Sequence, residues 1–186
     1  AYFDSKGDMR SILRVLFNSE FFKRARFQKV KSPTELVVGT LKLVGAHRFP
    51  GEGLAQLNTS TTLMGQQLMN APTVEGWHTG KEWINGGTLN RRVNFAVDEV
   101  ADVTKPGIQE MIARLKASGG PLSPQEFVDR CLDLIGPLQV DEDTRENLRR
   151  HATMDGDLSF QTAEEQVESS ERVGRMLQFI VASKEY

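Results

Sequence analysis

Apolar residues recur along most of this chain with the period of an α-helix. From Asp8 onward they fall at Met9, Ile12, Leu13 and Leu16, a spacing of i, i+3, i+4 and i+7 that places all four on one helical face. The strict alternation that marks a half-buried strand does not occur convincingly. The pattern predicts an all-α protein, an irregular bundle of about eight or nine helices with one long loop that contains tryptophan.

Capping signals set the predicted ends of these helices. Ser32 and Ser123 are each followed by proline, and Glu35 and Glu126 stand three positions after them. A serine can cap free amides, proline at N1 has no amide to satisfy, and the glutamate can reach back to the cap. Gly45 lies where a left-handed residue would end the first of these two helices. The other predicted starts are Asp8, Ser19, Leu54 (to about Leu68), Thr88, Pro106, Asp141 and Thr162.

Residues 70–87 have neither the helical nor the strand period, and they contain both tryptophans. Long irregular loops in compact domains are often functional. Two indoles with amide and charged side chains nearby could hold a sugar, a peptide or another small ligand. The simpler alternative is that both indoles anchor the loop against helix ends. The candidate ligand-binding residues are Gln66, Trp77, His78, Trp83, Asn85, Arg92 and Asn94.

The chain has nearly equal numbers of positive and negative side chains, so its net charge cannot attract nucleic acid or an anionic membrane. There are 23 Lys and Arg residues against 25 Asp and Glu, a formal net charge of -2, so no long-range field recruits nucleic acid or an anionic membrane. Residues 23–31 are locally basic and include Phe27, which could stack on a base. We expect a solvated face or a protein contact there, and no nucleic-acid partner.

Length and composition are those of an ordinary globular chain, and we expect a single helical domain over residues 1–186. No apolar run approaches the roughly 18 residues that a membrane-spanning helix needs. We therefore expect no transmembrane segment in this chain.

Few residues are available for metal or catalytic chemistry. Cys131 shares an apolar helical face with Phe127, so we expect a buried, inert thiol. A calcium loop beginning at Asp155 fails because Phe160 stands in place of the turn glycine and Gln166 in place of the bidentate glutamate. The histidines are too far apart in sequence for a helical zinc face, and a Gly-x-Ser-x-Gly elbow is missing. We expect no metal, no cofactor and no catalytic set, which favours a non-enzymatic protein without excluding an enzyme.

Several ordered motifs resemble one known family. They are Gly65-Gln66, Pro72, Gly76-Trp77, Trp83-Ile84 and residues 92–96, together with residues 8–10, 19–22, 31–38 and 172–186. These motifs resemble the shared core of a large bacterial family, domain of unknown function 1800. The resemblance implies a helical protein that is usually longer, so this chain would be the C-terminal portion of a larger product. It also implies an extracytoplasmic or cell-envelope location, because family members often begin with an export signal. No activity, cofactor or catalytic residue can be transferred from the family.

These observations favour a non-enzymatic interaction or scaffolding module of an exported bacterial protein. We expect its recognition surface at residues 77–83 and the helices that flank them, and its partner to be another protein or the N-terminal portion of the same chain. The alternative is part of a hydrolase that acts on an envelope or extracellular polymer, with a catalytic site shared with the N-terminal portion.

Overall fold

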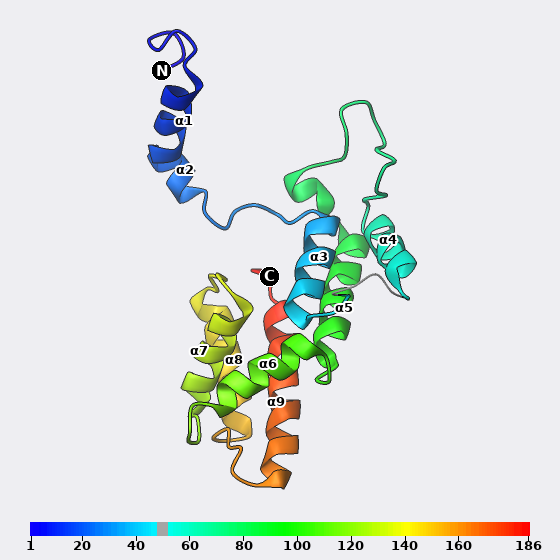
Figure 1. Cartoon of the computed structure of the whole chain (residues 1–186), viewed down its shortest axis with the longest axis vertical. Helices are drawn as coiled ribbons and strands as arrows, with labels where there is room; N and C mark the ends of the chain where they lie inside the picture. Colours follow the sequence, from blue (N-terminus) through cyan, green and yellow to red (C-terminus); the bar gives the residue numbers. More distant parts are fainter. Residues whose placement is uncertain (48–51) are drawn as a thin grey trace. The chain divides into compact units, whose positions relative to one another are not determined.

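The computed structural model describes residues 1–47 and 52–186, and these residues form nine α-helices, one short 3-10 helix and no strand. The all-α prediction is confirmed. Two compact units are present, residues 1–30 and residues 31–186 (Figure 1). The first unit contains α1 (Met9–Asn18) and α2 (Glu20–Arg24). The second contains α3 (Pro33–Val44), α4 (Leu54–Leu63), η1 (Gly80–Trp83), α5 (Gly86–Ala101), α6 (Pro106–Lys116), α7 (Pro124–Ile135), α8 (Glu142–Met154) and α9 (Ala163–Val181).

The predicted capping signals act as expected at the helix ends. Ser32 and Glu35 form a complete capping box at α3, and Ser123 and Glu126 form another at α7. Each box satisfies two backbone amides that a helix start would otherwise leave without partners. Gly45 ends α3 in the left-handed region, with φ of 68°, which glycine adopts without the steric cost of a Cβ atom.

Two predicted helices have different ends in the structure. α4 stops at Leu63, five residues before the expected end, because Gly65 adopts a left-handed φ of 102° and the Gln66 amide turns back to Thr61. α5 begins two residues earlier than expected, at Gly86. Glycine has poor helix propensity, but the capping hydrogen bonds of Asn85 offset this in the first turn.

α9 lies at the centre of the 31–186 unit and packs against α5, α6, α7 and α8 (Figure 1). Its side chains Val173, Leu177 and Ile180 are fully buried, and α7 adds Phe127 to the same cluster. A second, smaller core is formed by α3 and the end of α4, where Leu36, Val37, Leu41 and Met64 meet beside α5. These two cores fix the positions of α3 and α5, which carry most of the polar side chains discussed below.

Cys131 is completely buried in the larger core, as predicted. Burial disfavours the thiolate and raises the pKa of the Cys131 thiol well above its usual range. Among the described residues, no helix is both long and apolar enough to span a membrane.

Candidate functional site

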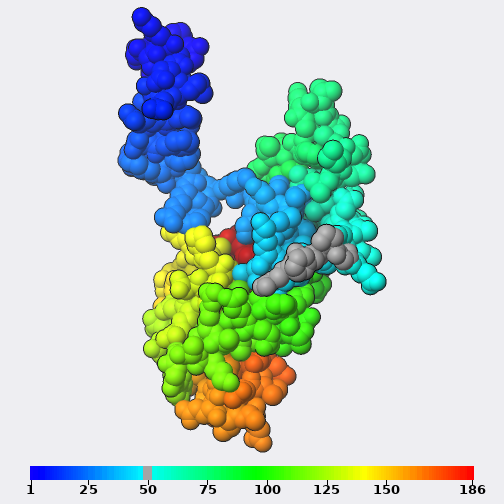
Figure 2. Space-filling model, viewed as in Figure 1, coloured from blue at the N-terminus to red at the C-terminus, as the bar shows by residue number. Residues whose placement is uncertain are grey.

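The irregular segment between α4 and α5 carries most of the predicted site residues. Its tip stands out from the surface of the 31–186 unit (Figures 1 and 2). Met69 and Val74 are almost completely exposed there, and a turn joins Thr73 to Gly76. The segment therefore has an exposed tip, with Trp77 directly after it and Trp83 at the end that joins α5.

Trp83 and Asn85 tie the end of this segment to α5. Trp83 is 6% exposed, and its backbone carbonyl accepts a hydrogen bond of 2.9 Å from Thr88 Oγ1. The Asn85 side chain accepts hydrogen bonds from the Gly87 and Thr88 amides, each at 3.0 Å. These contacts give Trp83 a core role and Asn85 a capping role, which agrees with the loop-anchor alternative for this indole.

Gln66 caps α3 from another part of the chain. Its Oε1 accepts a hydrogen bond of 2.9 Å from the Thr34 amide and one of 2.8 Å from Thr34 Oγ1. The side chain is buried, so both of its acceptor contacts lie away from bulk water. Gln66 thus joins the end of α4 to the beginning of α3.

Trp77, His78 and Asn94 have different environments. Trp77 is partly buried, and its Nε1 is buried without a hydrogen-bond partner in the described part of the chain. His78 is exposed, with its Nδ1 3.4 Å from Glu82 Oε2 and its ring edge-on to Trp83. Asn94 is exposed on α5. None of these three side chains lines the pocket between α8 and α9 described below.

Arg92 is the one predicted site residue that is both buried and charged. Its side chain is 8% exposed, and its Nη2 donates to the Lys31 carbonyl oxygen at 2.5 Å. Its Nη1 is buried and has no hydrogen-bond partner within residues 1–47 and 52–186. Lys31 lies beside it, with its ammonium 4.0 Å from the centre of the Tyr186 ring. Sequence reasoning missed Lys31 and Tyr186 because nothing in their local pattern indicates a contact between residues so far apart.

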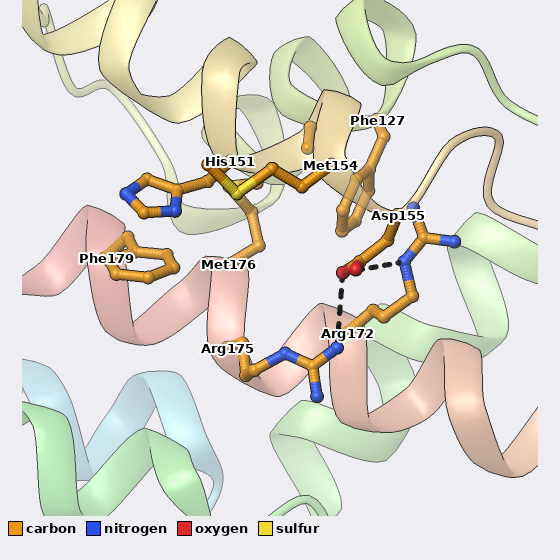
Figure 3. A pocket seen from close by; sticks show the side chains of 9 residues that line it. Phe127, His151, Met154, Asp155, Arg172, Arg175, Met176 and Phe179 are labelled. Atoms are coloured by element: carbon orange, nitrogen blue, oxygen red, sulfur yellow. Dashed lines mark hydrogen bonds and ion pairs between the residues drawn. The ribbon is translucent and has the colours of Figure 1, made fainter.

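A pocket of about 230 Å³ lies between α8 and α9 (Figure 3) and contains none of the predicted residues. Asp155 Oδ2 lies 3.3 Å from Arg175 Nη2 and 3.7 Å from Arg172 Nε. On the other side, the His151 ring stacks on Phe179 with 4.1 Å between centroids. Because the pocket is below the roughly 300 Å³ of most ligand pockets, and its carboxylate is already paired with two arginines, it has the character of a structural crevice.

Residues 1–30 carry an extensive apolar surface. Neither α1 nor α2 contains a buried residue. Phe17 and Phe22 stack edge to face at 5.1 Å and connect the two helices, while Arg10 and Arg14 lie beside Phe17 at the polar border of the α1 stripe. The exposed apolar side chains of the two helices, named here the α1–α2 face, are Met9, Leu13, Val15, Leu16, Phe17, Phe21 and Phe22.

The helical period alone did not reveal that the α1–α2 face is exposed, because the same spacing describes a buried face. One sequence signal was available. Six of the ten residues of α1 are apolar, which makes a wider stripe than one neighbouring helix covers. Together with the basic stretch that follows, this width is typical of a helix that needs a partner.

The comparisons with known proteins agree with the resemblance noted above. Neither a curated protein nor a solved structure matches the chain. A family model described as "Protein of unknown function (DUF1800)" matches residues 1–186. Because this match covers the whole chain, the protein belongs to the DUF1800 family.

Proposed function

We propose that this chain is a non-enzymatic helical interaction module that docks through the α1–α2 face onto an apolar helical surface of a protein. The observation that carries the proposal is the absence of any buried side chain in α1 and α2. The proposed recognition surface is therefore residues 9–22, which differs from the sequence-based expectation of residues 77–83 and their flanking helices.

The size of the face supports docking. Full burial of one Leu, Phe or Met side chain is worth about 1.5–3 kcal/mol, and seven such large side chains are exposed together on α1 and α2. Contiguous apolar patches of this kind usually mark interaction sites. Phe17, Phe21 and Phe22 supply the rigid aromatic anchors that often dominate an interface.

The charge around the face indicates the chemistry of the partner. Residues 1–30 contain seven Lys and Arg residues against three Asp and Glu. Arg10 and Arg14 border the apolar stripe, and Lys23 and Arg24 follow it in α2. A partner surface with an apolar centre and an acidic rim would complement this arrangement.

Such a surface could come from a separate partner protein or from the N-terminal portion of the same chain. Both sources offer the same chemistry, namely packed helices with an apolar groove. In line with the family resemblance, we place the complex outside the cytoplasm of a bacterium, in the cell envelope.

Site-specific photo-crosslinking of the full-length product in its native cell tests this proposal. One sample carries p-benzoylphenylalanine in place of Leu16 on the α1–α2 face, and the matched control carries it in place of Arg14, which is two residues away and therefore points to the other side of α1. We expect strong crosslinking from position 16, little from position 14, and loss of the crosslink when Leu13→Glu is added to a protein whose helical circular dichroism is unchanged.

Mass spectrometry of the crosslinked peptides identifies the source of the partner surface. A product within the N-terminal portion supports docking inside one chain, and a defined second protein supports a separate partner. Equal crosslinking from positions 16 and 14, or a product confined to residues 31–186 of the same chain, would overturn the proposal.

The hydrolase alternative rests on one contact, the 3.4 Å distance between His78 Nδ1 and Glu82 Oε2. A carboxylate that orients a histidine is part of many acyl-transfer sites, although both side chains are exposed here. If the full-length product hydrolyses a polymer, His78→Ala and Glu82→Gln should each lower kcat by at least about 100-fold. Unchanged kcat in both variants would remove this pair from the reaction.

A further inference from the structure

Two arginines are buried in the described part of the 31–186 unit, Arg92 and Arg172, and their hydrogen-bond environments are opposite. Arg172 is 6% exposed, and its Nη1 and Nη2 donate to the carbonyl oxygens of Asp157 and Gly156, at 2.9 and 2.6 Å. Its Nε also lies 3.7 Å from the Asp155 carboxylate. Each of the three guanidinium nitrogens of Arg172 therefore has a partner, and the side chain holds the turn at residues 155–157 against α9.

Arg92 is buried to nearly the same extent but lacks these partners. Its Nη2 donates to the Lys31 carbonyl oxygen, whereas its Nη1 is buried and has no acceptor among the residues that the structure describes. No ion pair joins Arg92 to a carboxylate among the described residues. Burial of a charged group costs free energy unless the group is paired, and a buried donor without an acceptor calls for a missing partner.

A second cation lies at the same place. The Lys31 ammonium sits over the Tyr186 ring, at 4.0 Å from its centroid. Burial lowers the pKa of Lys31, and the positive charge of Arg92 lowers it further, while Glu35 raises it. Arg92 thus disfavours the charged form of Lys31, and the Glu35 carboxylate offsets part of this effect. Lys31 is partly exposed, so this cluster meets solvent at Lys31.

The beginning of α3 adds partial positive charge beside this cluster without competing for the ligand. Residue 33 is proline and has no amide, the Thr34 amide donates to Gln66, and the Glu35 amide donates to Ser32 Oγ. These first-turn amides are therefore satisfied internally. The helix dipole still places partial positive charge at this end. The neutral amide of Gln66 leaves it unchanged, and the Glu35 carboxylate, which accepts from the Ser32 amide at 2.8 Å, offsets part of it.

We propose that Arg92 Nη1 and Lys31 Nζ form a binding site for a single oxyanion, either a phosphate group or a carboxylate. The anion supplies the acceptor that Nη1 lacks and the negative charge that the Lys31–Arg92 pair lacks. Because all of its residues lie in the 31–186 unit, this site is independent of the α1–α2 face.

Calorimetric titration of the whole chain with inorganic phosphate and, separately, with acetate, at constant ionic strength in chloride, tests the site. We expect saturable binding of one anion per chain. The phosphate and acetate arms show whether a phosphoryl group or a carboxylate is preferred. Lys31→Gln and Arg92→Gln should each weaken the preferred anion by at least about tenfold, since a charge-assisted hydrogen bond is worth about 1.5–3 kcal/mol.

Arg175→Gln is the matched control, because Arg175 is a half-exposed arginine of the same unit. The Arg175→Gln protein should bind the anion with unchanged affinity. Lys31→Gln keeps the test decisive if Arg92→Gln does not fold, because Lys31 is partly exposed. Failure of both anions to bind, or equal weakening in Lys31→Gln and Arg175→Gln, would overturn the site and indicate that water alone satisfies Arg92.

Discussion

Gln66 Oε1 accepts two hydrogen bonds from Thr34, a residue 32 positions earlier in the chain. Thr34 is the second residue of α3, and its backbone amide has no acceptor within the helix. The Gln66 side chain, which follows α4, supplies that acceptor. This contact shows that a residue selected from sequence as a ligand-binding candidate holds two helices together. Asn85, a second such candidate, caps the beginning of α5, so stability measurements can separate structural from binding roles.

Gln66→Ala should lower the free energy of unfolding by about 1–2 kcal/mol, because it leaves the Thr34 amide and hydroxyl without their acceptor in a partly buried place. Urea denaturation followed by circular dichroism measures the change. Gln67→Ala, at the exposed neighbouring position, should stay within about 0.5 kcal/mol of the unmodified protein. Equal effects of the two variants would contradict the capping role of Gln66.

Asn85→Ala should cost about 1 kcal/mol of stability, since it removes the side-chain acceptor for the Gly87 and Thr88 amides. Asn85→Asp should remain close to the unmodified protein because a carboxylate caps a helix equally well. The control is Asn94→Ala on the exposed side of the same helix, for which we expect no loss. Thermal and urea unfolding of all three variants measures these changes. An Asn85→Ala protein as stable as Asn94→Ala would contradict the capping role of Asn85.

The predictable part of the fold is the part that rests on local signals. Ser32 and Glu35 lie in one turn, so their capping box can be recognised from four consecutive residues. Arg92 contacts a carbonyl 61 positions away, and no local pattern indicates such a partner. The exposure of Phe17 could not be predicted from sequence either. Helical periodicity shows which side of a helix is apolar, but it does not show whether another element covers that side. The candidate site was therefore located by its irregular backbone, while the roles of its side chains required the tertiary structure.

Acid should reveal the contact between Asp141 and Lys184. A hydrogen bond from Lys184 and one from the Thr144 amide lower the pKa of Asp141 from its ordinary 3.8 to about 2. A carboxyl with a lowered pKa in the folded state contributes stability above its unfolded pKa, and this contribution is lost as the pH falls through the folded pKa. Stability that depends on Asp141 should therefore decrease between about pH 4 and pH 2.

Asp141→Asn isolates this effect, because asparagine retains the helix cap but cannot ionise. Urea midpoints measured from pH 5 to pH 2 should fall less steeply in Asp141→Asn than in the unmodified protein. In 0.5 M NaCl the difference should become smaller, since Lys184 is exposed and the pair is screened. Parallel pH profiles at low salt would show that the contact does not form in solution.

The end of α3 and the beginning of α6 approach so closely that only glycine fits between them. A Cβ atom on Gly107 would lie 2.2 Å from the Leu43 carbonyl oxygen and 2.7 Å from the Val44 carbonyl carbon. Both are backbone atoms of α3, so a rotamer change cannot relieve the clash. Gly107→Ala should therefore lower the free energy of unfolding by about 1–3 kcal/mol or more, as overpacking does elsewhere.

Gly39→Ala is the matched control in the middle of α3, where a Cβ atom would meet nothing within 4 Å. Alanine is a better helix former than glycine, so Gly39→Ala should raise stability by about 0.5–1 kcal/mol. Urea denaturation of both variants gives opposite signs for the same chemical change if the two helices meet backbone to backbone. A Gly107→Ala protein as stable as Gly39→Ala would mean that α6 does not contact the end of α3 in this way.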